Sequence, residues 1–563
     1  MLALLNIQGG TGSINEFPYF TFLFADLHAH LIGLPFTLLA LVLCVNFVKG
    51  ATPADPPAAR AVATVPQREL APIAGGAANV YPMTHARSIS WPTFRVSIST
   101  VAAIGLAGLV VGALYPINSW DYPTYLGLLA VSLLIPWYLS RQPDLRGLGV
   151  VLAQVACVAI LSQVLYRPFY AYFQSFYSGV HLGDEKSNVL WYVMINGLFL
   201  AVLLSYILIE GWVSYRRSGL LRSARLYLGR WDSLPRTLQL QKVLVHRENP
   251  RELLSLYGLI FLGLVVALCV LTGMALVGLL LVFLAATLVL GLRRARSGEE
   301  CLMLLLFATG LAISIGTEIV VIDGDVGRMN TIFKFYEQVW VLFGVASAVA
   351  LVQLAGRLPL IRSALLRRFW IAAIVALFVM ALIYPVVGTK ARVSQRFDQS
   401  IPPTLDGTAY MDRATYGDTD DQTHVSALLH LATDQAAMTW LQDHVDGTPT
   451  ILEGNRPLYR WGSRMSIYTG LPTVIGWDWH QKQQRSGYQS QIDDRLNDVR
   501  TMYDVPNVDQ TLALLHRYDV TYIIDGELEQ GFYPTARAKF DSMVGTYLTV
   551  AYDQNGVRIY QVK

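Results

Sequence analysis

Residues 302–321 read LMLLLFATGLAISIGTEIVV, a run of 20 residues in which Glu318 is the one charged side chain. A membrane-spanning helix needs about 20 consecutive apolar residues, so this stretch predicts one span. Similar runs lie at about residues 31–48, 96–115, 122–139, 148–166, 189–209, 253–271, 274–292, 337–356 and 369–387. The sequence therefore predicts a polytopic α-helical membrane protein with about ten transmembrane helices.

The composition of the whole chain agrees with this prediction. Of 563 residues, 53% are hydrophobic and only 15% are charged, and the mean hydropathy is +0.41. Soluble domains carry about 25% charged residues, so a disordered chain, a coiled coil and an ordinary cytosolic enzyme are excluded. The formal net charge of +3 is too small to indicate nucleic-acid binding. The chain also has no phosphate-cradling glycine-rich loop, no G-x-S-x-G and no C-x-x-C motif.

Lysine and arginine residues predict the orientation of the spans. If the segment before the first span lies outside, the inside loops hold 23 of these residues and the outside loops of the membrane part hold four. Short loops rich in Lys and Arg stay on the cytoplasmic side. We therefore expect a multi-pass protein of the plasma (cell) membrane, with a transmembrane domain over residues 1–387 and an extracytoplasmic domain over residues 388–563.

The C-terminal region alternates between helix and strand patterns. Helices are predicted at Gln435–His444 and Asp509–Tyr518, and strands at residues 450–452, 520–524, 544–552 and 557–562. This alternation predicts a small α/β domain.

Carboxylates at the predicted outer face are the first candidates for chemistry, because charged groups near a membrane face are expensive to keep. Nine lie in the outward loops and the adjoining span ends: Glu16, Asp26, Asp121, Asp184, Glu185, Glu318, Asp323, Asp325 and Glu337. A solvated loop end explains Asp184 and Glu185 best, and the other carboxylates fall into three clusters.

The first cluster runs from Glu16 to His30 and ends on Asp26-Leu-His28-Ala-His30, with apolar and aromatic residues between its ionisable groups. On a helix, Asp26 and His30 would share one face at positions i and i+4, while His28 would point elsewhere. An Asp and a His at this spacing bind a metal or form a proton-transfer pair. Alternatively, His30 is a core residue satisfied by the carboxylate. Asp26 and His30 are thus candidates for catalysis and for holding a divalent cation.

The second cluster is Asn118-Ser-Trp-Asp121-Tyr-Pro123. Capping of the third span explains its polar residues equally well, since Pro123 suits a first helical turn. The indole and phenol rings would also suit a sugar or a lipid headgroup. Asp121 is therefore a catalytic candidate.

The third cluster runs from Glu318, which lies within an apolar span, to Glu337, and it includes Arg328 and Lys334. Arg328 and Lys334 together would make an anion site, the arginine by its fork and the lysine as a point charge. Alternatively, these cations pair with Asp323 or Asp325. We take Glu318 as a catalytic candidate, and as substrate-binding candidates we take Asp323, Arg328, Asn330, Lys334 and Tyr336.

In the C-terminal region, residues 462–480 are dense in turn-forming and aromatic residues and end on Trp477-Asp-Trp-His480. Glycan-binding surfaces combine aromatic faces with nearby polar groups, so Trp477 and His480 are further substrate-binding candidates. A packed loop over the sheet explains the segment equally well.

Four segments resemble the YYY membrane-protein family, large bacterial and archaeal proteins that carry a domain of unknown function. The matching stretches are NEFPYFTFLFADLHAH (15–30), NSWDY (118–122), GRMNTIFKFY (327–336) and TGLPTVIGW (469–477). The resemblance spans nearly the whole chain. That family is similar to the GT-C glycosyltransferases, which take a sugar from a polyprenyl-phosphate donor on the outer face of the membrane. The resemblance thus implies a GT-C-like fold and activity.

This chain departs from the family at its N-terminus. The family has an N-terminal portion with further spans, an Asp-containing loop and a Tyr-Tyr-Tyr segment, and this chain contains no Tyr-Tyr-Tyr. We therefore expect a fragment, a split gene product or a short form, with a separate N-terminal subunit as a partner.

These observations lead to the hypothesis of a GT-C-type hexosyltransferase that uses a polyprenyl-phosphate-linked sugar at the membrane lipid surface. A carboxylate takes the acceptor proton while the lipid phosphate leaves, held by Arg328 and Lys334. One alternative is a non-enzymatic transporter or flippase for lipid-linked glycans, which needs polar residues through the spans, where Glu318 stands nearly alone. Another alternative is a structural subunit whose outer domain binds a partner.

Overall fold

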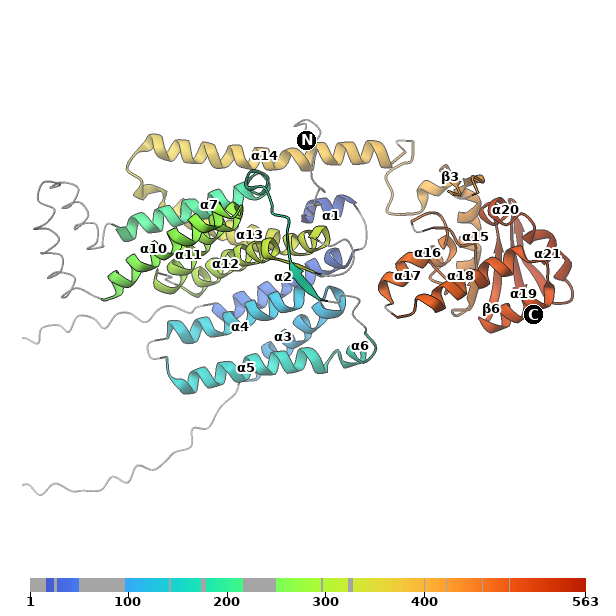
Figure 1. Cartoon of the computed structure of the whole chain (residues 1–563), viewed down its shortest axis with the longest axis horizontal. Coiled ribbons are helices and arrows are strands. Elements are labelled where there is room, and N and C mark those ends of the chain that lie inside the picture. Colours follow the sequence, from blue (N-terminus) through green and yellow to red (C-terminus); the bar gives the residue numbers. More distant parts are fainter. Residues whose placement is uncertain are drawn as a thin grey trace, which may run out of the picture. The chain divides into compact units, whose positions relative to one another are not determined.

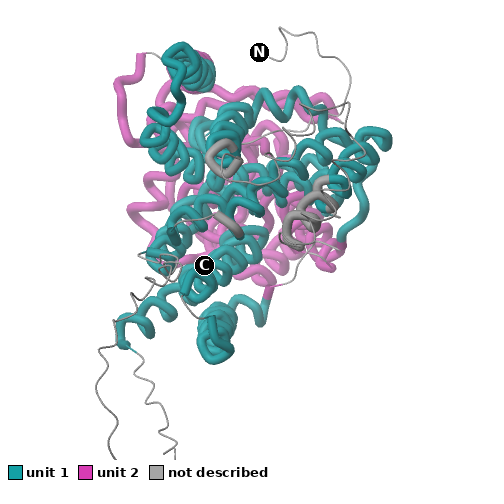
Figure 2. The backbone as a smooth tube through the Cα atoms, turned by 90° about the vertical axis from the view of Figure 1, so that its left-hand side faces the viewer, with its two compact units in different colours: residues 1–172, 180–322, 326–383 teal, residues 173–179, 323–325, 384–563 magenta. Residues whose placement is uncertain are grey.

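A computed structural model describes residues 17–24, 28–49, 97–140, 143–173, 179–215, 250–294, 297–322, 328–398, 400–421, 423–457, 459–485 and 487–563. The chain divides into two compact units (Figure 2). Unit 1 takes residues 1–172, 180–322 and 326–383, and unit 2 takes residues 173–179, 323–325 and 384–563.

Unit 1 is built from helices and one short ribbon (Figure 1). Its helices are α1 (Pro18–Phe24), α2 (Ala29–Val48), α3 (Ile98–Ile117), α4 (Asp121–Leu139), α5 (Leu145–Val164), α6 (Arg167–Tyr172), α7 (Val189–Tyr215), α10 (Pro250–Leu271), α11 (Ala275–Arg294), α12 (Gly298–Ile319), α13 (Arg328–Arg357), the 3-10 turn η3 (Leu358–Leu360) and the first part of α14 (Ala364–Arg396). Strands β1 (Val180–Leu182) and β2 (Val320–Ile322) pair antiparallel.

Within the described ranges, nine helices are long and apolar enough to cross a membrane: α2, α3, α4, α5, α7, α11, α12, α13 and α14. The tenth predicted span falls on α10, in which Ile260–Leu271 forms a shorter apolar segment. The prediction of a polytopic helical membrane protein is confirmed. The basic loops that predict its orientation, at residues 50–96 and 216–249, lie outside the described residues.

Successive spans run antiparallel, so unit 1 has two ends. The turn between α3 and α4 and the β1–β2 ribbon lie at one end, which we call the Asp121 end. The opposite end, where α13 finishes, we call the Arg357 end. Three helices that begin at the Arg357 end are capped by a side chain that accepts a backbone N–H: Ser97 from Thr100, Asp144 from Gly147 and Ser297 from Glu300.

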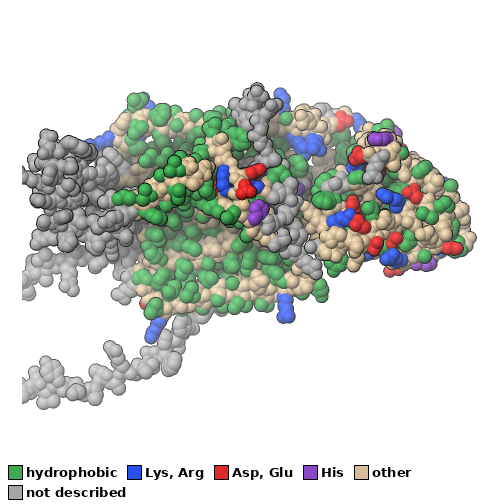
Figure 3. Space-filling model, viewed as in Figure 1, with side chains coloured by type: hydrophobic (Ala, Val, Ile, Leu, Met, Phe, Trp, Pro, Cys, Tyr) green, Lys and Arg blue, Asp and Glu red, His purple; other side chains and the backbone are tan. Residues whose placement is uncertain are grey.

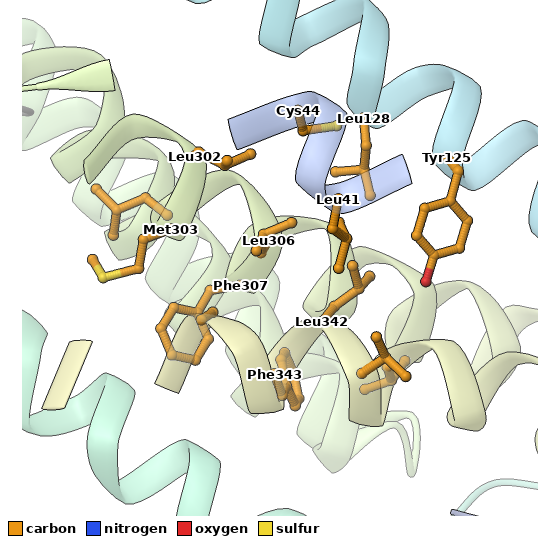
Figure 4. Packing of buried hydrophobic residues seen from close by; sticks show 14 of the residues in the cluster. Leu41, Cys44, Tyr125, Leu128, Leu302, Met303, Leu306, Phe307, Leu342 and Phe343 are labelled. Atoms are coloured by element: carbon orange, nitrogen blue, oxygen red, sulfur yellow. The ribbon is translucent and has the colours of Figure 1, made fainter. Parts of the chain in front are cut away.

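Helix α12 lies at the centre of unit 1, packing on α11 and α13 and also contacting α2 and α4. Leu306 and Phe307 of α12 belong to the same buried cluster as Leu342 and Phe343 of α13 (Figure 4). A Cβ atom on Gly310 would lie 2.5 Å from the ring of Phe343. The glycine therefore lets α12 and α13 approach closely, as small residues do between membrane helices.

The visible face of unit 1 is largely hydrophobic, while unit 2 carries many charged side chains (Figure 3). The spans keep apolar side chains exposed, for example Phe261 on α10 (69%), Val352 on α13 (75%) and Phe369 on α14 (69%). In a membrane protein such side chains face lipid, because hydrocarbon does not penalise apolar surface.

Unit 2 contains a four-stranded mixed sheet in the order β5-β6-β8-β7. Its strands are β5 (Thr450–Leu452), β6 (Val520–Asp525), β7 (Leu548–Gln554) and β8 (Val557–Val562), with β5 parallel to β6 and β8 antiparallel to both neighbours. Asn555 and Gly556 turn β7 into β8 with φ of 52° and 82°, the left-handed pair that a two-residue hairpin requires.

The remaining elements of unit 2 are the turn η4 (Ala409–Asp412), the hairpin β3 (Thr415–Thr419) and β4 (Ser426–His430), and the helices α15 (Leu431–His444), α16 (Arg464–Thr469), α17 (Asp478–Gln484), α18 (Gln489–Asp504), α19 (Val508–Arg517), α20 (Glu527–Phe532) and α21 (Ala536–Met543). The two predicted helices and the strands β5, β6 and β8 are confirmed. The predicted strand at 544–552 was wrong in its start, because residue 544 forms only an isolated bridge and residues 545–547 form a turn through Gly545 at φ 91°.

Candidate functional site

A group of buried polar side chains lies at the Asp121 end of unit 1. We call it the Asp121 cluster and define it as Thr21, His30, Asp121, Glu337 and Gln338. Each is buried, with exposed fractions between 3% and 7%. They come from α1, α2, α4 and α13, so residues far apart in sequence meet here. Ionisable groups buried in a membrane protein are functional candidates by default.

Asp121 owes its position to the turn that joins α3 to α4. Asn118 ends α3, its N–H donating to the Leu114 carbonyl at 2.7 Å, and the Asp121 N–H donates to the Asn118 carbonyl at 2.9 Å. Asp121 is thus the first residue of α4, where a carboxylate is favoured by the helix dipole. The predicted side-chain cap is absent, because Trp120 precedes the first turn of α4 and no side chain caps it there, and Asp121 is buried.

Two charged or ionisable partners surround Asp121. Both the Glu337 carboxylate and the His30 imidazole lie close enough to act on its charge. The His30 ring meets Phe333 of α13 edge-on, with centroids 5.9 Å apart. Thr21 Oγ1 donates to Glu337 Oε2 at 3.1 Å, which ties α1 to α13. The site therefore combines two carboxylates and an imidazole.

Gln338 links the cluster to the α3–α4 turn, because its Nε2 donates to the Trp120 carbonyl at 3.2 Å. Its Oε1 atom is buried and has no hydrogen-bond partner among the described residues, and the same holds for Nε1 of Trp340. Buried polar atoms in folded proteins are nearly always satisfied by protein, water or ligand. Water or a polar group of a ligand would satisfy these two atoms of α13.

This arrangement suits proton transfer. A carboxylate near an imidazole can remove a proton from a hydroxyl group, and a second carboxylate keeps a proton within the site. The described residues include no group of three His, Cys, Asp or Glu side chains arranged to hold a metal ion. Asp26, which we predicted to join His30 in catalysis or metal binding, lies outside the described residues.

Glu318 and Arg328 form a second buried group beside the β1–β2 ribbon. Arg328 Nη2 donates to Glu318 Oε1 and to Ser187 Oγ, both at 2.9 Å. The Ser187 N–H donates to Glu318 Oε2 at 2.8 Å, and Lys186 Nζ donates to the Glu318 carbonyl at the same distance. Glu318 thus binds both Arg328 and Lys186. Asp323 and Asp325, the predicted partners of Arg328 and Lys334, lie outside the described residues.

The structure separates the remaining candidates of this segment. Lys334 follows Phe333, the ring that meets His30, and its Nζ lies 5.9 Å from that ring's centroid. Tyr336 is buried, with its ring edge-on to Tyr192 at 6.0 Å. The backbone of Asn330 belongs to α13, but its side chain is not described. Lys334 therefore lies beside Phe333, the ring that contacts His30 of the Asp121 cluster.

Trp477 and His480 lie in unit 2, where both line a cavity of about 520 Å³. The Trp477 Nε1 donates to the Arg460 carbonyl at 3.3 Å, and the ring of Tyr459 lies edge-on to the indole at 5.3 Å. The segment therefore borders a cavity as well as packing against its neighbours.

Sequence reasoning missed Glu337, Gln338 and Thr21. Glu337 was counted among the outer carboxylates but was given no role, because its neighbours from α1 and α4 cannot be read from local spacing. One signal was available, since Glu337 opens the apolar run 337–356. A carboxylate inside a predicted span is an intramembrane candidate.

Glu318 is not nearly alone as a charged residue in the spans, contrary to our prediction, because further charged side chains are buried in the helices. At the Arg357 end, Arg357 Nη1 pairs with Glu210 of α7 at 2.9 Å and Nη2 with Glu300 of α12 at 3.3 Å. The Tyr206 hydroxyl also donates to Glu300. This network joins α7, α12 and α13 at the end opposite to the Asp121 cluster.

Comparison with known proteins gives one family. The model of a family described as uncharacterized membrane protein (DUF2298) matches residues 6–343. This range includes the Asp121 cluster and the Glu318–Arg328 pair. The expected resemblance to a membrane-protein family without an assigned activity is confirmed at that level. No curated protein matches the chain.

Proposed function

The chain belongs to the DUF2298 family of uncharacterized membrane proteins, and we propose that it transfers a sugar from a polyprenyl-phosphate donor to a hydroxyl acceptor. One observation carries the proposal: Asp121, Glu337 and His30 are buried together at one end of a membrane helix bundle. A lipid-linked donor presents its phosphate and sugar at the end of a bundle, where a general base is needed.

The reaction balances as follows. The acceptor oxygen forms a bond to the anomeric carbon of the sugar while the bond from that carbon to the phosphate oxygen breaks. The acceptor proton passes to the Asp121 carboxylate, and the electron pair of the broken bond leaves with the polyprenyl phosphate. His30 orients Asp121, and Glu337 accepts from Thr21, which fixes its place beside the base.

Lys334 and Arg328 would stabilise the leaving phosphate. Lys334 is the better placed of the two, because it follows the ring that contacts His30. Arg328 Nη2 donates hydrogen bonds to Glu318 and Ser187. The Nε atom of Arg328 is also buried and has no hydrogen-bond partner in the described residues. Glu318 then acts by positioning Arg328 rather than as a base.

The finer parts of the proposal come from the sequence resemblance. They are a GT-C-like fold, hexosyl transfer, a reaction on the outer face of the plasma membrane with unit 2 on that side, and a separate N-terminal subunit. A divalent cation held by Asp26 and His30 belongs here too. The rival proposal of a flippase needs polar groups along the spans, whereas the buried carboxylates described here gather at the two ends.

The test uses the full chain purified into lipid nanodiscs and proteoliposomes. Radiolabelled polyprenyl-phosphate mannose and polyprenyl-phosphate glucose are supplied with a cell-envelope glycan fraction as acceptor. The proposal expects free polyprenyl phosphate and labelled glycan to appear together. Movement of a fluorescent polyprenyl-phosphate sugar between leaflets, without release of polyprenyl phosphate, would replace the transferase by a flippase.

A further inference from the structure

The cavity in unit 2 has a chemical character that neither the family nor the proposed reaction assigns. It measures about 520 Å³, within the range of about 300–1,000 Å³ typical of small-molecule sites. Its lining includes Arg485 and Arg495, and among the described residues that line it there is no Asp or Glu. A ligand with negative charge is therefore favoured over a neutral or cationic one.

Arg485 is the cation available to a ligand. Arg495 donates Nη1 to the Val474 carbonyl at 2.9 Å and lies over the ring of Tyr518 at 5.0 Å. Within the described chain, the exposed side chain of Arg485 has no ion pair or hydrogen bond. A guanidinium of this kind binds a carboxylate or phosphate through two parallel hydrogen bonds.

Two hydroxyl groups of the lining also lack partners. The Oγ of Ser463 and the Oγ1 of Thr473 are buried, and neither has a hydrogen-bond partner among the described residues. Ser463 itself is only 4% exposed and holds a left-handed backbone conformation at φ 64°. Since buried hydroxyls are normally satisfied, these two are free to bond a ligand that carries hydroxyl groups.

The rest of the lining suits a sugar ring. The Trp477 indole is held by its bond to the Arg460 carbonyl and by the ring of Tyr459. The amides of Gln481 and Gln491 add groups that both donate and accept hydrogen bonds. Apolar ring faces with convergent amides and hydroxyls match a saccharide, whose carbon face and hydroxyl edges need both.

We propose that this cavity binds an anionic saccharide, with Arg485 on the carboxylate or phosphate of the sugar and Ser463 and Thr473 on its hydroxyls. The inference rests on the proposed function for one point, that the bound saccharide is the acceptor of the transfer. Binding itself requires no chemistry in unit 1, so the two proposals can fail separately.

The test measures binding to the full chain in nanodiscs by titration calorimetry. The probes are methyl glucuronide, neutral methyl glucoside, glucose 6-phosphate and inorganic phosphate. Methyl glucuronide or glucose 6-phosphate should bind at least about tenfold more tightly than methyl glucoside, since a charge-assisted contact is worth about ten- to a hundredfold in affinity. The comparison of these two anionic sugars tells carboxylate from phosphate.

Arg485→Gln should remove that advantage and leave the neutral sugar unchanged, while Ser463→Ala should weaken the neutral and anionic sugars alike. Arg413→Gln, at an exposed arginine of unit 2 away from the cavity, is the matched control and should bind as the parent does. Equal affinity for anionic and neutral sugars, or an unaffected Arg485→Gln variant, overturns the proposal. If inorganic phosphate binds and none of the sugars does, the cavity is a simple anion site and the proposal is overturned too.

Asp121→Asn separates this result from the transferase proposal. If the anionic sugar binds this variant as tightly as the parent, the proposed saccharide site is supported, whether or not the parent uses a polyprenyl-phosphate donor. If the parent releases polyprenyl phosphate but binds no anionic sugar, the transferase proposal is supported and the proposal of a saccharide site is overturned.

Discussion

Gly33 and Asp121 fit against each other so closely that a Cβ atom on Gly33 would lie 2.9 Å from Asp121 Oδ2. Real Cβ atoms almost never approach an oxygen so closely, so α2 can pass the buried carboxylate only because residue 33 has no side chain. Gly33 stands three positions after His30, and on a helix this places the two on one face. The same helix face therefore supplies both the imidazole and the space for the carboxylate.

Gly33→Ala should therefore displace the Asp121 side chain and slow the release of polyprenyl phosphate by about tenfold or more, because small misplacements of a catalytic group are costly. Gly105→Ala on α3 is the matched control, since nothing lies within 4 Å of a Cβ atom there. Turnover of both variants, normalised to folded protein, decides the point. Equal loss in the two variants would point to a general effect on the bundle.

Asp121→Asn keeps the size of the side chain but removes the base. We expect a loss of about a hundred- to ten-thousandfold in transfer, the usual contribution of general base catalysis, with donor binding retained. The control is Asp144→Asn, where asparagine can still cap α5. A fully active Asp121→Asn variant would make Asp121 a structural residue and pass the role of base to Glu337 or Asp26.

The spans could be predicted from the sequence because each follows from one local property, the length of an apolar run. Unit 2 was harder to predict. Helix α18 carries Ile492, Val499 and Met502 on its buried side within a polar sequence, and this weak periodicity was overlooked. The Asp121 cluster could be predicted only in part, because the partnership of Thr21 with Glu337 depends on how α1 meets α13. Such contacts between distant segments have no local signature.

The anion site is tested by Lys334→Ala and Arg328→Ala. Lys334→Ala should weaken donor binding by about ten- to a hundredfold with normal folding, while Lys390→Ala, at an exposed lysine of α14, should not. Arg328→Ala should in addition destabilise the protein by about 3–5 kcal/mol, because it leaves Glu318 buried without its cation. Arg328→Lys should recover part of the loss, since lysine cannot reproduce the fork.

Donor affinity by titration and thermal unfolding in detergent measure the two effects separately. Unchanged donor affinity in both alanine variants would mean that these cations serve only the fold. Acceptor affinity should change little in either case.

The orientation is tested by single cysteines in a chain whose native Cys44, Cys157, Cys269 and Cys301 are replaced. A cysteine at Ser223, in the basic segment between α7 and α10, should resist an impermeant maleimide in intact cells. A cysteine at Thr404 in unit 2 should react, because the lysine and arginine bias places unit 2 outside. Lysed cells control for access, since both positions should then react. The opposite labelling pattern would move the Asp121 end to the cytoplasmic side.

The stability of unit 2 should depend on pH through Asp525 and Glu529. Burial is the largest influence on the Asp525 carboxyl and raises its pKa to about 6, although Arg537 pairs with it. Glu529 is buried as well, but the Arg464 guanidinium, with Nη2 at 2.8 Å, outweighs burial and lowers the pKa of Glu529.

The signs of the two effects differ. A raised pKa means that folded Asp525 holds its proton more tightly than the unfolded chain does, so its contribution is fully present below about pH 4 and is lost as the pH rises to about 6. The contribution of Glu529 is present above its ordinary pKa and is lost below about pH 4.3. Burial also raises the pKa of Glu453 and of Asp504 in unit 2, so these carboxyls add to the effect of Asp525 with the same sign. Between about pH 4.5 and 6.5, the contribution of Asp525 itself should fall by about 2 kcal/mol.

Asp525→Asn should reduce the loss of stability between these pH values by the share of Asp525, because asparagine does not titrate. Asp519→Asn, at an exposed aspartate just before β6, is the control and should keep the full loss. Pulse proteolysis of the full chain in detergent, scored by cleavage within residues 400–563, reports the stability of unit 2 at each pH. If Asp525→Asn keeps the full pH dependence of the parent, other residues account for it, and the burial of Asp525 has no thermodynamic consequence in this range.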